Sequence, residues 1–346
     1  MRPEPGDMTA LDVDVRDFAR EEWNQLAGGM AGFSLMQCWE WGEAKASTGP
    51  WRVERGTLGC DGRTVGAFQA LVRALPGGLR GGLVWINRAP LWRTSDDDGP
   101  APPDAMMSAL AHHYVDRRGF YLRLAPAQSE DGFQLNDGGL VRAGVEGWAS
   151  AVLDLGRPAP DLRLGLRQKW RNALNKAERS GLEVRVGPGE GLFAEFLAGY
   201  RHMTRERGFD TSVTPELLAA LQSVLPVEGR METFLATHDG APAGSVLMVR
   251  HGDTAEYLAG TVAEAGRAVN AGQLLLWRAV VAMKEQGARR FDLGGLDTRL
   301  TPPGIYRFKD GLGGVPYRLA PELEALDRGL LGWLVRWRVR AARSRA

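Results

Sequence analysis

The chain has 346 residues, of which 44% are hydrophobic and 25% are charged, and its formal net charge is only +1. Such a length predicts more than one domain, because a single hydrophobic core seldom organises so long a chain. The near-zero charge excludes a nucleic-acid binder that acts through its overall charge, so any charge-based recognition has to be local. The two cysteines, Cys38 and Cys60, have no metal-ligand spacing and form no disulfide framework, which favours a reducing compartment.

The N-terminal residues 1–7 carry Pro, Gly and acidic side chains instead of a basic segment followed by an apolar run. No signal peptide is predicted from this pattern. No stretch reaches the roughly 18 uninterrupted apolar residues that a membrane-spanning helix needs. We therefore expect a cytoplasmic protein that can also approach the inner face of the membrane.

Helical and strand-like patterns alternate along the first part of the chain. Residues 14–48 read as helical, and Ser95 to Pro103 reads as a surface loop. The remaining predicted elements of this part are strands at residues 51–58, 64–75, 83–86 and 120–124 and a helix at residues 104–118. This mixture predicts an α/β protein.

One hairpin pattern occurs in both halves of the chain. Asp61-Gly62 is followed by Gly66 and an alternating apolar run, and Asp239-Gly240 is followed by Gly244 and a similar run. Asp-Gly between strand-like segments is a strong hairpin signal, because Gly accepts positive φ at the turn. The later Gly in each copy indicates a bulge or a close backbone approach in the second strand. We interpret the pattern as a duplicated lobe; two unrelated hairpins are the alternative.

The second copy continues with a strand at residues 251–260, a loop at 267–272, a helix at 273–286 and a strand at 290–293. This order resembles the core of the GNAT acyltransferase fold, in which the loop before the helix turns backbone N–H groups toward a diphosphate. Arg267 and Gly272 match the usual loop, but Asn270 stands where its first Gly is expected. Such a loop is a poor diphosphate cradle, which argues against coenzyme A as the donor.

Five motifs in order resemble the Fem-type aminoacyltransferases. The first is QCWEWGEAK at residues 37–45, which is similar to the family's opening motif, and the second is LRQKWRNALNKA at residues 166–177. The others are TRERGF at 204–209, YLAG at 257–260, and DLGG at 292–295 followed by IYRFK at 305–309. Together they extend over most of residues 37–315.

The resemblance implies an α/β fold of two GNAT-like lobes, with mixed sheets flanked by helices. No sustained heptad run is present, so we expect the form without a coiled-coil arm. We place the first lobe at residues 1–155, the second at 156–325 and a basic amphipathic helix at 326–346. The resemblance further implies aminoacyl-tRNA as donor, a UDP- or lipid-linked muropeptide or another peptide amine as acceptor, and no cofactor or metal.

The residues themselves agree with direct aminolysis of an ester. No Ser-His-Asp or Cys-His arrangement is evident, and the five histidines have no metal spacing. By resemblance, Lys309 stabilises the tetrahedral intermediate and Phe308 packs beside the terminal adenosine of the donor. The alternative for Lys309 is the ordinary position of a lysine at the surface, here at the end of a strand.

The resemblance carries over Lys45, Arg207 and Tyr257 as residues that bind the acceptor. Lys and Arg suit the diphosphate of a cell-wall precursor through charge and directed hydrogen bonds. Other interpretations stay open: Lys45 as a solvated helix-end lysine, Arg201 or Arg205 in place of Arg207, and Tyr257 as a core aromatic. No general base can be assigned, and Asp292 is a candidate by position only.

The predicted helix at residues 161–180 has one apolar face and one basic face. We expect its basic residues to contact phosphates of the donor tRNA or of the precursor, and the alternative is a solvated face. The residues concerned are Arg163, Arg167, Lys169 and Arg171.

The tail at residues 326–346 combines Trp333 and Trp337 with leucines and arginines on one amphipathic helix. This pattern is typical of helices that lie in a membrane interface, so a peripheral membrane contact is one expectation. Packing of the two Trp side chains onto the protein body is the other.

Two further functions compete with aminoacyl-tRNA-dependent transfer. A GNAT-type N-acyltransferase that uses an acyl-coenzyme A thioester is disfavoured by Asn270. A non-catalytic nucleic-acid-binding protein is disfavoured by the near-neutral charge and by the Phe308-Lys309 pair.

Overall fold

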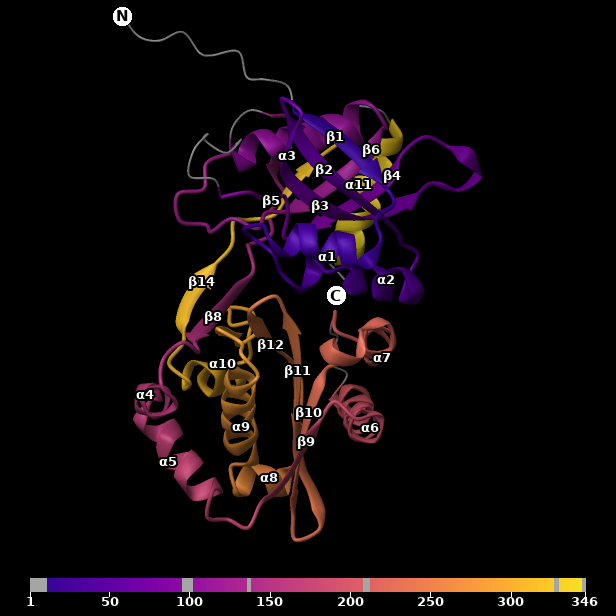
Figure 1. The fold of residues 1–346 in the computed structure, drawn as a ribbon. Coiled ribbons are helices and arrows are strands. Elements are labelled where there is room, and N and C mark those ends of the chain that lie inside the picture. The colour runs from indigo at the N-terminus through magenta and orange to yellow at the C-terminus, as the bar shows by residue number, and fades with distance from the viewer. Residues whose placement is uncertain (1–10, 95–101, 136–137, 208–211, 327–329, 344–346) are drawn as a thin grey trace, which may run out of the picture. The chain divides into compact units, whose positions relative to one another are not determined.

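The computed structural model describes residues 11–94, 102–135, 138–207, 212–326 and 330–343. The chain divides into two compact units, one formed by Met1–Gly147 with Arg318–Ala346 and the other by Trp148–Tyr317. Each unit contains one mixed sheet with helices packed against it (Figure 1). The α/β architecture expected from the sequence is therefore confirmed.

Unit 1 is the part that contains both ends of the chain. Its elements are β1 (Asp12–Arg16), α1 (Arg20–Gly28), η1 (Leu35–Gln37), α2 (Trp39–Thr48), β2 (Arg52–Cys60), β3 (Arg63–Ala74), η2 (Pro76–Gly78), β4 (Gly82–Asn87), β5 (Leu91–Trp92), α3 (Pro103–Ala111), the π-helical turn η3 (His112–Asp116), β6 (Phe120–Ala125), β7 (Val141–Arg142), β15 (Leu323–Ala325) and α11 (Leu330–Arg343).

Unit 2 is continuous in sequence. Its elements are β8 (Ala149–Asp154), α4 (Ala159–Gly165), α5 (Gln168–Ala177), β9 (Glu183–Gly187), α6 (Glu190–Arg207), α7 (Pro215–Val224), η4 (Val227–Gly229), β10 (Glu232–His238), β11 (Ala241–His251), β12 (Thr254–Val262), α8 (Glu264–Ala268), α9 (Ala271–Glu285), β13 (Arg290–Asp292), α10 (Pro303–Asp310) and β14 (Val315–Arg318).

The two sheets have the same topology from their first edge strand to the parallel pair, beyond which the next strand is β15, the last strand of unit 1, or β8, the first strand of unit 2. In the described residues, the first sheet has the order β1-β2-β3-β4-β6-β15-β7, and the second has the order β9-β10-β11-β12-β13-β8-β14. In each sheet an antiparallel hairpin is followed by a third antiparallel strand and then by a parallel neighbour, which is β6 beside β4 and β13 beside β12. The parallel pairs are connected through α3 and α9 respectively. The duplication predicted from the two hairpins is confirmed.

The hairpins also agree in detail. Asp61 and Gly62 have φ of 50° and 74°, and Asp239 and Gly240 have φ of 50° and 76°, so both turns have two residues with positive φ. A register shift follows in each, because Leu58 and Gly59 pair with Gly66 and Thr64, and Ala236 and Thr237 pair with Gly244 and Pro242. Each second strand thus carries one extra residue directly before its Gly, as a β-bulge.

The core of unit 2 lies between its sheet and the pair α5 and α9, which lie on the opposite side of the sheet from α6 and α7 (Figure 1). Leu174 of α5, Leu275 of α9 and Phe291 of β13 are among its fully buried members. In unit 1, α3 covers one face of the sheet with Met106 and Leu110. Because side chains alternate along a strand, Tyr121 and Gln69 belong to the other face, which α11 and α2 cover.

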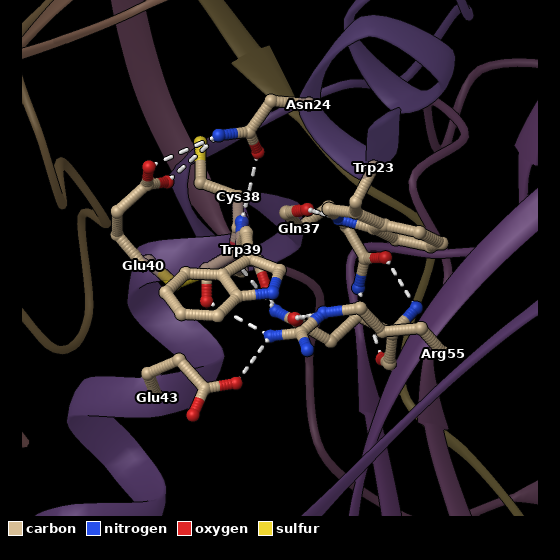
Figure 2. Close-up of polar contacts among 10 residues, drawn as sticks. Trp23, Asn24, Gln37, Cys38, Trp39, Glu40, Glu43 and Arg55 are labelled. Atoms are coloured by element: carbon tan, nitrogen blue, oxygen red, sulfur yellow. Dashed lines mark hydrogen bonds and ion pairs between the residues drawn. The ribbon is translucent and has the colours of Figure 1, made fainter. Parts of the chain in front are cut away.

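A polar clamp holds α2 to the strands of unit 1 (Figure 2). The fully buried Gln37 side chain donates to the carbonyls of Gln69 and Asn87 and accepts from the Gln69 N–H at 2.7 Å. The Arg55 guanidinium donates to the Gln69 side chain at 2.7 Å and to Glu43 at 2.9 Å. Most of the polar side chains of residues 37–45 therefore serve to hold this helix in place, since buried polar groups need partners.

Two predicted helices differ from the observed elements. Residues 14–48 begin with strand β1, which pairs with β2, and α1 and α2 follow separately. The helix predicted at residues 161–180 is interrupted at Leu166 and Arg167, whose backbones are extended. The interruption has a tertiary cause, because the Arg167 N–H donates to the Gly311 carbonyl at 3.0 Å instead of continuing a helix.

The domain boundaries also differ from the predicted ones at residues 155 and 325. Strand β8 pairs with β13, so unit 2 begins at Trp148 and includes the segment that was assigned to the first lobe. Strand β15 pairs with β6 and β7, so the chain returns to unit 1 from Arg318 onward. The tail helix α11 packs against β4 and β6 and belongs to unit 1. Long-range strand pairing set these boundaries, and it leaves no local mark in the sequence.

We predict that Gly244→Ala destabilises the protein by about 1–3 kcal/mol, the usual cost of overpacking. A Cβ at this position would lie 2.9 Å from the Thr261 carbonyl oxygen and 3.3 Å from Leu275. Urea unfolding measures the effect. Gly199→Ala is the matched control, because a Cβ there meets nothing within 4 Å and the residue lies within α6. Equal stability of the two variants would contradict the close approach at Gly244.

Candidate active site

The parallel strands β12 and β13 separate at one end. They pair from Thr254 to Glu256 against Arg290 to Asp292, after which β13 ends and β12 continues to Val262. A bulge at Leu258, opposite Leu247 and Met248, bends β12 at the same place. The carboxyl ends of parallel strands are the usual position of ligand sites in α/β sheets. The chemistry-bearing residues of unit 2 gather at this separation.

Lys309 reaches this point from α10, with only 7% of its surface exposed. Its ammonium donates to the carbonyls of Gly294 and Gly295, at 3.0 and 3.1 Å, directly after β13. The nitrogen also lies 5.0 Å from the centre of the Tyr257 ring. The alternative of a surface lysine on a strand end is wrong, because Lys309 is a buried helix residue that is directed at the end of the sheet.

The environment of Lys309 disfavours its charged form. Burial lowers the pKa of the ammonium from 10.5 to about 8, and the carboxylates of Asp292 and Glu256 partly oppose this change. Near neutral pH the Lys309 side chain is therefore still mostly charged, and its ammonium is poorly solvated. Such a cation interacts strongly with any negative charge that develops beside it.

Asp292, the last residue of β13, is fully engaged. One of its oxygens accepts from the Ser150 hydroxyl at 2.5 Å and from the Gly294 N–H at 2.8 Å, and the other accepts from the Tyr317 hydroxyl at 2.6 Å. The first two bonds fix the turn after β13, and the third joins it to β14. The carboxylate therefore orients the carbonyls that hold Lys309, and both of its oxygens already accept hydrogen bonds from these donors.

Gly294 allows this turn. It has φ of +61°, and a Cβ there would lie 2.5 Å from the Tyr257 carbonyl oxygen and 3.6 Å from the Lys309 nitrogen. A side chain at this position would be strained and would also meet the backbone of β12. The motif DLGG at residues 292–295 carries the signal for Gly294, whereas no motif in the sequence marks Ser150 or Tyr317.

The side chain of Phe308, which belongs to α10, lies against the start of α9. A Cβ on Gly272 would lie 3.3 Å from the Phe308 ring, so this ring covers the first turn of the helix. Asn270 precedes the helix with φ of 58° and ψ of 36°, and its carbonyl accepts from the N–H groups of Gln273 and Leu274. Ala271 and Gly272 are both buried. The loop that the sequence identified as a poor diphosphate cradle is thus closed by an aromatic side chain.

The start of α5 holds α10 in position. The Trp170 indole N–H donates to the Phe308 carbonyl at 2.9 Å, and the Arg167 guanidinium pairs with Asp310 at 2.8 Å. A Cβ on Gly311 would lie 2.3 Å from the Trp170 ring, so the two segments are in close contact. Phe308 and Lys309 owe their orientation to this contact.

The four basic residues expected to bind phosphates have different environments. Arg163 pairs with Glu178 at 2.6 Å and donates to Asn175, and Arg167 pairs with Asp310. Arg171 donates to the Leu164 carbonyl at 3.0 Å, whereas Lys169 is exposed. Arg163 and Arg167 therefore act first as internal connections.

The three residues expected to bind the acceptor lie on separate elements. Tyr257 is at the Lys309 site, and burial beside Tyr200 raises the pKa of its hydroxyl. Lys45 is on α2 of unit 1, where burial lowers the pKa of its ammonium, 5.7 Å from the Trp41 ring. The side chain of Arg207, at the end of α6, lies outside the described residues. Lys309, Phe308 and Tyr257 are thus brought together within unit 2.

Two kinds of feature are absent from the described residues. In these residues, no group of three or more His, Cys, Asp or Glu side chains is arranged to hold a metal ion. Within the same ranges, no helix is long and apolar enough to cross a membrane.

Residues 165–310 match the family model described as an acetyltransferase (GNAT) domain. The crystal structure of FemX is similar over 93% of this chain and 100% of that chain, with 15% sequence identity and a TM-score of 0.76. A conserved protein of unknown function from Bacteroides thetaiotaomicron VPI-5482 is similar over 91% of this chain and 100% of that one, with 10% identity and a TM-score of 0.60. No curated protein sequence matches the chain.

These similarities agree with the geometry. The fold of the whole chain is similar to that of FemX, with two GNAT-like units, and residues 165–310 match a GNAT acetyltransferase domain. The expected class of enzyme, an acyltransferase, is confirmed by this domain. The matched range begins just before α5 and ends at Asp310, so it includes every element that positions Lys309 except the flanking strands β8 and β14.

We predict that Lys309 makes stability depend on pH in a defined direction. Its pKa is lower in the folded than in the unfolded chain, so the unfolded chain binds more protons between pH about 8 and 10.5. The free energy of unfolding of the wild type should therefore rise relative to Lys309→Met, by about 1–2 kcal/mol between pH 8 and 9.5. Urea unfolding at several pH values measures this difference. A constant difference across that range would contradict the lowered pKa of the buried Lys309.

Proposed function

We propose that this protein transfers an aminoacyl group from aminoacyl-tRNA to an amine of a peptidoglycan precursor or a related peptide. The observation that carries the proposal is the Lys309 ammonium, held by two glycine carbonyls where β12 and β13 separate. An acyl carbonyl at this place would meet a positive charge that is already positioned. The motifs that resemble the Fem-type family, and the Fem-type fold, both support this reading.

The reaction needs little covalent help from the protein. The acceptor nitrogen attacks the ester carbonyl carbon, a C–N bond forms, and the bond from carbon to the ribose oxygen breaks. An ammonium has three N–H groups, of which two donate to Gly294 and Gly295. The third remains for the oxyanion of the tetrahedral intermediate. Positioning of the two substrates supplies the other part of the rate enhancement.

The proton of the attacking amine goes to the departing ribose oxygen in this proposal. Asp292 is the carboxylate next to Lys309, but Ser150, Tyr317 and the Gly294 N–H already use its oxygens. Its role is to position the turn and to favour the charged form of Lys309. A direct transfer between amine and leaving group requires no further protein base.

The closed start of α9 favours an aminoacyl ester over a coenzyme A thioester. In a diphosphate cradle the first N–H groups of the helix point at the ligand, and bulky side chains are absent there. Here Gly272 lies under the Phe308 ring and Ala271 is fully buried. We propose that Phe308 contacts the terminal adenosine of the donor, where an aromatic face suits a base.

Residues beyond Lys309 and Phe308 are proposed to contact the donor and the acceptor. Lys169 and Arg171, with Arg163 and Arg167 beside them, are proposed to border the path of the donor tRNA along α5. Tyr257, Lys45 and Arg207 are each proposed to contact the acceptor, as the resemblance implies.

We expect purified protein to consume charged tRNA in the presence of an acceptor amine and to leave acyl-coenzyme A unchanged. The measurement supplies labelled aminoacyl-tRNA pools and labelled acetyl-coenzyme A in parallel, with the Lys309→Met protein as the background. Saturable turnover of acetyl-coenzyme A without turnover of aminoacyl-tRNA would replace the proposal by the thioester-dependent reaction.

Lys309→Met should lower kcat by about 10²–10³-fold, the range typical for loss of one oxyanion donor, with KM nearly unchanged. The ammonium meets the oxyanion only as the carbonyl becomes tetrahedral, so its loss affects the transition state. Lys309→Arg should restore little activity, because a planar guanidinium does not fit a compact site.

The matched control for this experiment is Lys284→Met. Lys284 is a half-buried lysine of the same unit that donates to the Leu155 carbonyl at 2.7 Å, away from the separated strands. We expect near wild-type kcat from this variant. A folded Lys309→Met protein with normal kcat, or with its whole defect in KM, would remove Lys309 from the chemistry.

A further inference from the structure

The helix α11 is tied to unit 1 by a buried carboxylate. Glu324 of β15 is only 1% exposed, accepts from the Tyr121 hydroxyl at 2.6 Å, and pairs with Arg336 and with Arg340. Burying a carboxylate without partners costs several kcal/mol, so these two arginines hold the helix firmly in one rotation about its axis. The helix packs against β4 and β6 in that orientation.

The exposed side of α11 carries an apolar stripe that no described residue covers. Trp333 is 54% exposed, Leu334 is 41% exposed and Trp337 is 59% exposed. Positions 333, 334 and 337 are neighbours on a helix surface, whereas Val335 and Val339 lie on the far side and are half-buried. The prediction that the two Trp side chains pack onto the protein body is wrong, because both are more than half exposed.

Arginines border this stripe on both sides. At 100° per residue, Arg336 and Arg340 lie along one edge of the stripe and the exposed Arg338 lies along the other. The sequence of α11, LLGWLVRWRVRAAR, contains no acidic residue. An apolar stripe between cationic borders is complementary to a surface that is apolar inside and anionic at its headgroups.

We propose that α11 docks this protein on an anionic lipid surface, with Trp333, Leu334 and Trp337 at the boundary between headgroups and acyl chains. Indole rings favour that boundary, and the long arginine side chains reach the phosphates above it. The proposal does not rest on the identity of the acyl donor. It places the enzyme beside acceptors that carry a lipid.

Two other partners fit the exposed stripe of α11 less well than a lipid surface does. Nucleic acid would stack on the indoles and pair with the arginines, but two of the bordering arginines are already paired with Glu324. A second copy of the helix would bring arginines of both copies together with no acid on either helix to compensate.

The test is co-sedimentation of the full-length protein with vesicles of phosphatidylcholine containing roughly one third phosphatidylglycerol. We expect the wild type to bind and Trp333→Gln with Trp337→Gln to lower the partition coefficient by about tenfold or more, since each indole contributes a large apolar area. Brominated lipids should quench part of the wild-type Trp fluorescence, and less of that of the variant. Leu79→Gln with Val227→Gln is the matched control, because both residues are exposed apolar side chains outside α11.

Melting temperatures accompany these measurements, and exposed positions should leave them unchanged. Transfer to a soluble acceptor should also persist in the double Trp variant, which separates membrane docking from catalysis. The proposal is overturned if the wild type ignores the vesicles or if the double Trp variant binds them as the wild type does. It is equally overturned if that variant loses tRNA binding or self-association while vesicle binding remains.

Discussion

The site depends on one constraint: a lysine ammonium is kept inside the protein, and it has to be compensated there. Burying a charge is costly unless hydrogen bonds and opposite charge surround it. Lys309 obtains both from the turn after β13, through two carbonyls and through the nearby carboxylates of Asp292 and Glu256. Asp292 in turn requires Ser150 of β8 and Tyr317 of β14. Both ends of unit 2 therefore converge on the residue that orients its lysine.

The two units share a topology, but only one of them has this opening in the described residues. In unit 1, β4 and β6 pair along their whole lengths, from Gly82 to Asn87 and from Phe120 to Ala125. In unit 2 the corresponding pair is joined at three positions only and then separates. A ligand can enter between strands only where their hydrogen bonds are absent. This difference favours unit 2 as the unit that performs the chemistry.

Several arginines of this protein form ion pairs within their own unit and so hold its elements together. Arg163 and Arg167 were expected to contact phosphates, yet each is paired with a carboxylate of its own unit, and Arg55 of unit 1 is paired in the same way. Planar guanidinium groups suit such pairs because they donate in two directions at once. The arginines of α11 combine both uses, since Arg336 and Arg340 hold the helix while Arg338 stays exposed.

The sequence by itself determined the features that short segments control. The two Asp-Gly hairpins, their bulges before Gly66 and Gly244, the α/β class and the duplicated lobe were all predictable, because turn residues and alternation act over a few positions. The Phe308-Lys309 pair was recognisable as a motif for the same reason.

The tertiary structure alone decided what depends on distant segments. The pairing of β8 with β13 and of β15 with β6 moved both domain boundaries, and the Gly311 carbonyl interrupted a helix at Arg167. Contacts between residues far apart in the chain bury Lys309 and let Asp292 position the turn after β13. Such contacts also hold α11 in the orientation that exposes Trp333 and Trp337. Local patterns carry no record of such partners, because burial and hydrogen bonding are properties of the packed chain.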